Sequence, residues 1–170
     1  MPDTISLRPA VPHDIPQILA FIQGLAEYEK LAHACVATEE SLRQTLFGPR
    51  PFAEVIIADW NGEPAGFALF FHNYSTFRAR PGIYLEDLYV DPSLRGRGIG
   101  KALLKELAGL AVQRGCARLE WSVLDWNSPA IEFYESLGAE PQEEWTIFRL
   151  TDESLHRFTA SSTPANAPIP

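Results

Sequence analysis

Two different spacings of apolar residues alternate along the chain, and their order predicts a mixed α/β protein. Alternating or continuous apolar runs, typical of strands, occupy 5–7, 55–58, 66–72, 83–90, 119–124 and 145–150. Apolar residues at helical spacing occupy 15–25, 38–48, 98–114 and 127–137. The resulting order, β-α-α-β-β-β-α-β-α-β, favours a mixed central sheet with helices on both faces, in the α/β (α+β) class.

Turn and capping signals separate these runs. Asn61-Gly62 predicts a tight hairpin turn, and the polar residues 73–80 predict a loop. Asp14 and Thr38 are expected to cap the first two helices. Gly138 is expected to end the last one.

Composition indicates one globular domain, expected over residues 1–158, followed by a tail at 159–170. The tail is rich in Ala, Ser, Thr and Pro, and we expect it to be disordered. The 170 residues are 46% hydrophobic and 21% charged, as in ordinary globular proteins. No apolar run is long enough to cross a membrane and the first residues lack a signal peptide, so the expected location is the cytoplasm.

The net charge of the chain limits the kinds of molecule that it is expected to bind. The formal net charge of −8 argues against nucleic acid and fits a small cationic substrate. The four histidines and two cysteines have no metal-ligand spacing, so no metal site is expected, and both thiols are expected to be reduced.

The most informative segment is the glycine loop at 94–101, which lies between a predicted strand and a predicted helix. Its sequence is Leu-Arg-Gly-Arg-Gly-Ile-Gly-Lys. Backbone N–H groups of such a loop converge at the positive end of a helix dipole, and glycine lets a large anion approach the main chain. The expected ligand therefore carries a pyrophosphate. The alternative is a glycine-rich turn that merely begins an ordinary helix.

Two common glycine-loop families do not fit this spacing. A nucleotide-hydrolase loop needs Ser or Thr after the lysine, and Ala102 follows Lys101 here. The glycines also lack the Gly-x-Gly-x-x-Gly spacing of dinucleotide-binding folds. What remains is Arg-x-x-Gly-x-Gly at Arg95, Gly98 and Gly100.

That motif resembles the acetyl-CoA signature of the GNAT N-acetyltransferases. Three further segments agree with it in the right order: the first strand with its two helices, the strand exit at Asn127, and Phe133-Tyr134. The resemblance covers residues 4–150 and implies the GNAT fold with acetyl-CoA as cosubstrate.

Within that family the chain is similar to the diamine acetyltransferases, the branch that acts on spermidine, spermine and thialysine. The likeness rests on Leu25–Leu31, Tyr84–Val90 and Val123–Asn127. One departure is at Glu143-Glu144-Trp145, which lacks the glycine that the family usually has between glutamate and tryptophan.

The resemblance implies a set of cofactor-binding residues. The loop would bind the pyrophosphate, the strand before it would bulge and expose backbone groups to the pantetheine arm, and an asparagine would contact the cofactor. These residues are Leu88, Tyr89, Val90, Arg95, Gly96, Arg97, Gly98, Ile99, Gly100, Lys101 and Asn127. Asn127 can equally be a plain helix cap.

The resemblance also implies catalytic and substrate residues. Tyr134 matches the family's general acid, which would protonate the departing sulfur. A phenol with a pKa near 10 is protonated at neutral pH and can donate that proton. The alternative is that Tyr134 is a core aromatic. Glu86 is expected to face the substrate amine and accept its proton through water, whereas Asp87 is expected to make a structural hydrogen bond. The remaining candidate substrate residues are Tyr28, Glu29, Trp126 and Glu144.

The sequence therefore predicts direct acetyl transfer from acetyl-CoA to a primary amine of a small polyamine or lysine-like molecule. The family also implies a homodimer. Two alternatives stay open: transfer to another amine, such as that of an aminoglycoside, an amino acid or a protein, and a non-catalytic CoA-binding module.

Overall fold

The computed structural model describes residues 3–160. Its contacts divide the chain into two units, one ending at Asn127 and one beginning at Ser128. The single domain expected over 1–158 stays a prediction. Residues 161–170 of the expected tail lie outside the described residues.

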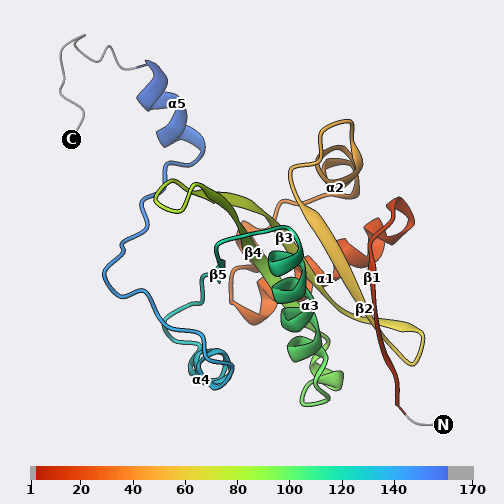
Figure 1. Cartoon of the computed structure of the whole chain (residues 1–170). Helices are drawn as coiled ribbons and strands as arrows, with labels where there is room; N and C mark the ends of the chain where they lie inside the picture. The colour runs from red at the N-terminus through yellow and green to blue at the C-terminus, as the bar shows by residue number, and fades with distance from the viewer. Residues whose placement is uncertain (1–2, 161–170) are drawn as a thin grey trace. The chain divides into compact units, whose positions relative to one another are not determined.

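The first unit is built on a five-stranded sheet in the order β1-β2-β3-β4-β5 (Figure 1). Neighbouring strands are antiparallel, except that β4 and β5 are parallel. The strands are β1 (Ile5–Pro9), β2 (Glu54–Trp60), β3 (Glu63–Ser75), β4 (Arg80–Val90) and β5 (Leu119–Trp121). The predicted mixed sheet is confirmed.

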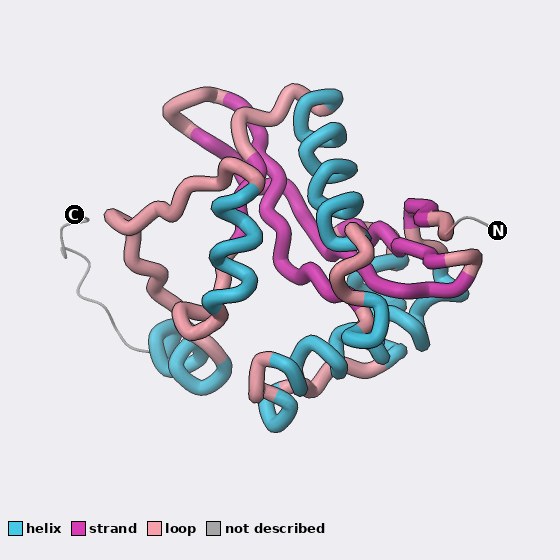
Figure 2. The backbone as a smooth tube through the Cα atoms, turned by 90° about the horizontal axis from the view of Figure 1, so that it is seen from below, coloured by secondary structure: helices cyan, strands magenta, loops and turns pink. Residues whose placement is uncertain are grey.

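Helices cover both faces of this sheet (Figure 2). They are α1 (Ile15–Tyr28), α2 (Glu39–Phe47) and α3 (Ile99–Gln113), with short 3-10 turns at Pro12–Asp14, Ala32–Ala34 and Pro92–Leu94. Helices α1 and α2 pack with Ile57, Phe67 and Tyr89 in one core cluster. Because strand side chains alternate, the neighbouring Val90 points to the opposite face, where it lies against Gly100 of α3.

Most element boundaries follow the predicted signals. Thr38 caps α2 by accepting a hydrogen bond from the Ser41 backbone N–H. Asn61 and Gly62 adopt the left-handed backbone that their hairpin turn requires. The loop expected at 73–80 is wrong in extent, because β3 and β4 continue to Ser75 and from Arg80 and leave only a four-residue turn.

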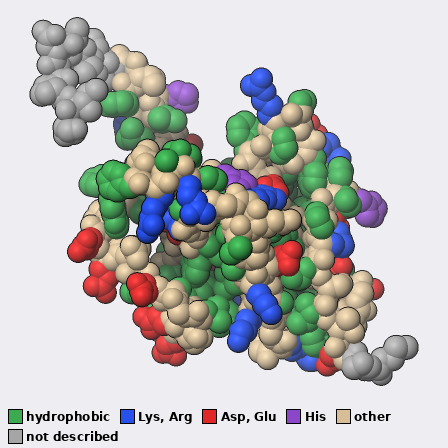
Figure 3. Space-filling model, in the orientation of Figure 1, with side chains coloured by type: hydrophobic (Ala, Val, Ile, Leu, Met, Phe, Trp, Pro, Cys, Tyr) green, Lys and Arg blue, Asp and Glu red, His purple; other side chains and the backbone are tan. Residues whose placement is uncertain are grey.

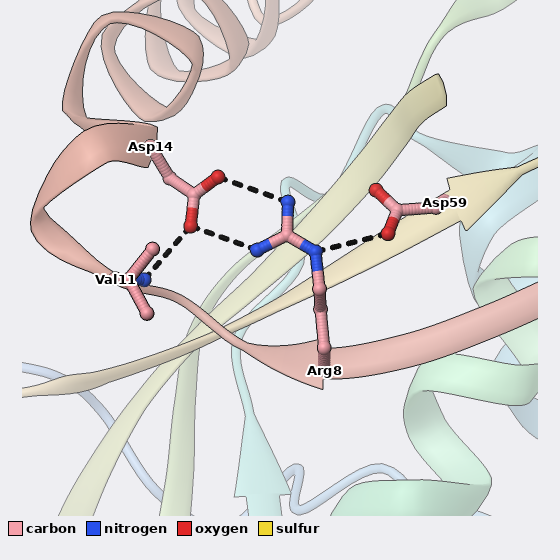
Figure 4. A network of polar contacts seen from close by, with 4 residues as sticks. All are labelled: Arg8, Val11, Asp14 and Asp59. Atoms are coloured by element: carbon pink, nitrogen blue, oxygen red, sulfur yellow. Dashed lines mark hydrogen bonds and ion pairs between the residues drawn. The ribbon is translucent and has the colours of Figure 1, made fainter. Parts of the chain in front are cut away.

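Asp14 is at the N-terminus of α1 but does not cap it. Its carboxylate instead accepts two hydrogen bonds from Arg8, at 2.8 and 2.9 Å, and one from the Val11 N–H at 2.8 Å (Figure 4). The Arg8 Nε also donates to Asp59 at 2.9 Å. Arg8 thereby joins β1 to β2 and to the start of α1, and it holds the pKa of Asp14 below its usual value.

The second unit contains α4 (Ser128–Ser136) and α5 (Asp152–Ala160). Gly138 ends α4 as predicted, with a φ of 86°. The strand predicted at 145–150 is wrong: these residues form no strand in the described structure, and Phe148 is 92% exposed. α5 includes Thr159 and Ala160, the first two residues of the expected tail.

Candidate active site

Strand β4 contains a β-bulge at Glu86. Leu69 of β3 pairs with Asp87, whereas the next residue, Phe70, pairs with Leu85, so Glu86 has no partner across the ladder. The resemblance implied a bulge at 88–90, but the irregularity lies two residues earlier. Bulges redirect side chains and are common beside active sites.

Beyond the bulge, no strand of residues 3–160 pairs with the second edge of β4, which is called the open edge below. Strand β5 pairs only with Ile83–Leu85. Because the Asp91 N–H donates to Ala65 of β3, alternation turns the backbone groups of Val90 and Leu88 toward the opposite edge. An extended ligand at this edge therefore finds main-chain donors and acceptors.

The glycine loop leads from this edge into α3. Gly96 and Gly98 have φ values of 76° and 85°, which disfavour any residue with a Cβ. Gly98 is the N-cap residue of α3 and provides no side-chain cap. The first intrahelical bond runs from Ala102 N–H to Gly98 carbonyl, so the N–H groups of the first turn, Ile99 to Lys101, have no helical acceptor. They can bind an anion.

The three basic side chains of this segment differ in their contacts. Arg95 lies over the Tyr28 ring, 4.6 Å from its centroid, and its Nε donates to the Val90 carbonyl at 3.2 Å. Arg97 instead lies over Trp60 of β2, 5.2 Å from the ring centroid. Lys101 is exposed. In Figure 3, Lys and Arg side chains gather at the lower end of α3, where the loop enters the helix.

Three expected site residues meet at the end of α1. The Tyr28 hydroxyl donates to Asn127 Oδ1 at 3.1 Å, and the rings of Tyr28 and Trp126 lie 6.3 Å apart. Asn127 is buried, at 7% exposure. The structure thus brings together residues that are about a hundred positions apart in the sequence.

Burial perturbs two of the acidic groups nearby. Burial, aided by the charges of Glu86 and Glu29, raises the pKa of Asp87 to about 6. Burial also raises the pKa of Glu29, whereas the Glu86 side chain is exposed. A perturbed carboxyl in an open site is typical of functional groups, and Asp87 is the one that sequence reasoning missed.

The hydrogen bond expected for Asp87 is not found. Among residues 3–160 no side-chain hydrogen bond to its carboxylate is observed. Two adjacent carboxylates in an apolar strand were the signal in the sequence, but the residue pattern does not show which of them is buried in the fold.

The remaining candidates, Tyr134 and Glu144, belong to the second unit. Tyr134 lies on α4, half-buried, with its ring 5.5 Å from that of Phe133. Glu144 is exposed and lines a shallow hollow with Glu143 and Trp145. The roles of Tyr134 and Glu144 stay predictions.

Comparisons with known proteins agree with this geometry. The model of the acetyltransferase (GNAT) family matches residues 21–139. Thialysine N-epsilon-acetyltransferase of Bos taurus is 40% identical, over 91% of this chain and 96% of its own. L-ornithine N5-acetyltransferase of Arabidopsis thaliana is 35% identical, over 88% and 85%.

A solved structure has the same fold. The integron cassette protein VCH_CASS6 from the mobile metagenome of V. cholerae superposes with a TM-score of 0.79 at 27% identity, over 92% of this chain and 98% of its own. No helix of residues 3–160 is long and apolar enough to cross a membrane. The glycine loop, the open edge of β4 and these relatives together show that the chain belongs to the GNAT acetyltransferase family and is an N-acetyltransferase.

Proposed function

We propose that this enzyme transfers the acetyl group of acetyl-CoA directly to a primary amine of a small polyamine or lysine-like molecule. The observation that carries the proposal is the meeting of Asp87, Glu29 and the Tyr28–Trp126 ring pair with the open edge of β4 and the glycine loop. Relatives named for thialysine and L-ornithine support an amine at the end of an amino-acid side chain.

The chain offers a fitting cradle for the cosubstrate. The uncapped first turn of α3 and the positive-φ glycines 96 and 98 suit a pyrophosphate. The Leu88 backbone and the Val90 N–H suit an extended amide-bearing arm, whereas the Val90 carbonyl already accepts a hydrogen bond from Arg95. Arg95 adds positive charge at the same place. Arg97 would first have to leave the Trp60 ring to do so.

Transfer forms a bond between the acceptor nitrogen and the acetyl carbon and breaks the carbon–sulfur bond. The acceptor amine must lose a proton, and the departing thiolate must gain one. Tyr134 is the proposed donor to sulfur, because an ordinary phenol stays protonated at neutral pH.

Two adjacent carboxylates are candidates for the acceptor's proton. The family resemblance favours Glu86, acting through water. The structure adds Asp87, because its pKa of about 6 lies near neutral pH, where a general base is most effective. Single variants Glu86→Gln and Asp87→Asn separate the two.

The proposal is tested by a CoA-release assay with acetyl-CoA and a panel of amines: spermidine, spermine, putrescine, thialysine, lysine and an aminoglycoside. Turnover of a polyamine or a lysine-like amine supports it. Turnover of the aminoglycoside alone, or acetyl-CoA binding without turnover of any amine, contradicts it and favours the corresponding alternative.

A homodimer and a cytoplasmic location belong to the same proposal; the family resemblance supports the homodimer, and the sequence pattern of the first residues supports the location. Light scattering coupled to gel filtration measures the assembly, and fractionation of cells that express the tagged chain measures the location. A monomer at working concentration, or a tagged chain outside the cytoplasmic fraction, would contradict the respective expectation.

A further inference from the structure

The chain's own cations already occupy aromatic faces in the candidate acceptor site. Arg95 lies 4.6 Å from the centroid of Tyr28, Tyr28 lies 6.3 Å from Trp126, and the Lys30 ammonium lies 4.9 Å from the centroid of Trp126. Each ring therefore has one face covered by a positive group. Such faces are the usual place for an acceptor's cationic chain, so this site is less suited to a second cation than its aromatic content suggests.

The backbone of Lys30 is unusual for a lysine. The Leu31 N–H donates to Ala26 carbonyl and the Lys30 N–H donates to Glu27 carbonyl, the two bonds that close a helix through a left-handed residue. Lys30 is that residue, with a φ of 61°. Glycine is the common choice at this position because it has no Cβ, and the feature that distinguishes lysine here is its side chain.

The Trp126 ring positions the Lys30 ammonium without neutralising its charge. No ion pair to Lys30 is found among residues 3–160, although Glu27 and Glu29 are close in sequence. An aromatic face attracts the ammonium through the ring's charge distribution and leaves its N–H donors available. The exposed ammonium can therefore donate to an anion placed beside Trp126.

Positive and negative groups thus separate within one site. Asp87 and Glu29 supply acidic groups, while Lys30 supplies a cation at the Trp126 ring. An acceptor with an amine at one end and a carboxylate at the other matches this separation. A simple diamine would bring a second ammonium toward Lys30 and be repelled.

We propose that Lys30 binds the carboxylate of an amino-acid acceptor and is the residue that distinguishes an α,ω-diamino acid from the diamine of the same length. The proposal rests on the function proposed above, because it names the acceptor class of the same site. It makes Lys30 a specificity-determining residue.

The test compares acceptors that differ only in this carboxylate. Lysine and cadaverine form one matched pair, and ornithine and putrescine form the second. We expect the wild-type kcat/KM to be higher for the amino acid in each pair, by about 5- to 30-fold for one partly exposed charge-assisted contact.

Variants at Lys30 then assign the preference. Lys30→Gln should remove it, mainly by raising the KM of the amino acid, Lys30→Glu should reverse it, and Lys30→Arg should restore most of it. Lys105→Gln, an exposed lysine of α3 outside the site, is the matched control and should leave the ratio unchanged.

The possible results separate this proposal from the function beneath it. Equal kcat/KM within both pairs, or a preference that survives Lys30→Gln, overturns the role of Lys30 and leaves acetyl transfer to small amines standing. Absence of turnover for all four acceptors and for the polyamines overturns the proposed function, and this inference falls with it.

Discussion

Replacing Gly98 by alanine tests the glycine loop, because this residue occupies two demanding positions at once. It is the N-cap of α3 and it has a φ of 85°. A Cβ built at Gly98 meets no atom within 4 Å, so the free protein has room for a methyl group. The cost of Gly98→Ala therefore comes from the backbone conformation in the free protein and from the approach of the ligand in the complex.

The backbone cost can be stated from the conformation alone. A left-handed residue with a Cβ costs about 1–2 kcal/mol relative to glycine. For a domain of this size each kcal/mol lowers Tm by roughly 2–4 °C. The Tm of Gly98→Ala is therefore expected to be about 2–8 °C lower than that of the wild type, with the fold retained.

The effect on cosubstrate affinity should be larger. Loss of one charge-assisted hydrogen bond between a backbone N–H and phosphate costs roughly 1.5–3 kcal/mol, which raises Kd by about 10- to 150-fold. Calorimetric titration with acetyl-CoA measures it. The bulkier Gly98→Val should weaken binding further.

Gly109 offers a matched control on the same helix. It is exposed, its φ is not left-handed, and a Cβ built there also meets nothing within 4 Å. Gly109→Ala should stabilise α3 by about 0.5–1 kcal/mol and leave acetyl-CoA affinity unchanged. If Gly98→Ala binds acetyl-CoA as tightly as the wild type, the assignment of this loop to the pyrophosphate is wrong.

Three further predictions concern the carboxylates, the proposed acid and the buried ion network. Because the pKa of Asp87 is raised to about 6, its base form appears as pH rises through that value, and kcat/KM should increase across pH 5–7. Asp87→Asn should abolish this increase and Glu86→Gln should retain it. The reverse pattern would return the base role to Glu86. Tyr134→Phe should lower kcat with acetyl-CoA affinity preserved, and unchanged kcat in single-turnover experiments would exclude the acid role. Arg8→Met should lower the free energy of unfolding in urea by about 2–3 kcal/mol, because it leaves Asp14 and Asp59 buried without their cation. This loss should shrink as pH falls toward the lowered pKa of Asp14. An equal loss at pH 3 and pH 7 would argue against the electrostatic explanation.

The sequence predicted those elements whose signals are local. Helix α3 follows from the spacing of Ile99, Leu103 and Leu107, all of which are buried. The cap at Thr38 and the turn at Asn61 follow from residue types with strong backbone preferences. In each case the physical cause lies within a few residues of its effect.

Elements that depend on a distant partner were less predictable. Residues 145–150 have strand-like composition, but a strand also needs a neighbour for its hydrogen bonds, and among residues 3–160 none pairs with them. Conversely, the polar residues 73–80 predicted a loop, although β3 and β4 continue through half of them as a long hairpin. In both cases the secondary structure depended on hydrogen bonds to a neighbouring strand, and such hydrogen bonds cannot be predicted from one segment alone.

The candidate site divides in the same way. Glycines 96 and 98 were identifiable because positive φ is a property of residue type. The raised pKa of Asp87 was not, since it depends on burial in the folded chain and on the nearby charges of Glu86 and Glu29. The alternation of strand side chains places two adjacent carboxylates on opposite faces, but it does not indicate which of them is buried from solvent.

The charge of the acceptor site is the clearest property that only tertiary structure determines. From the sequence, Tyr28 and Trp126 were candidate substrate residues, and aromatic rings of this kind attract cations. In the fold, Arg95 and Lys30 cover one face of each ring. Since cation–π attraction acts over only a few ångströms, the preference of the rings for an acceptor depends on which cations the fold has already placed there. For this chain those cations favour an acceptor that brings a carboxylate, even though its net charge is −8. Global charge therefore governs the attraction of a cationic amine from solution, whereas the local arrangement around Lys30 governs which amine is held.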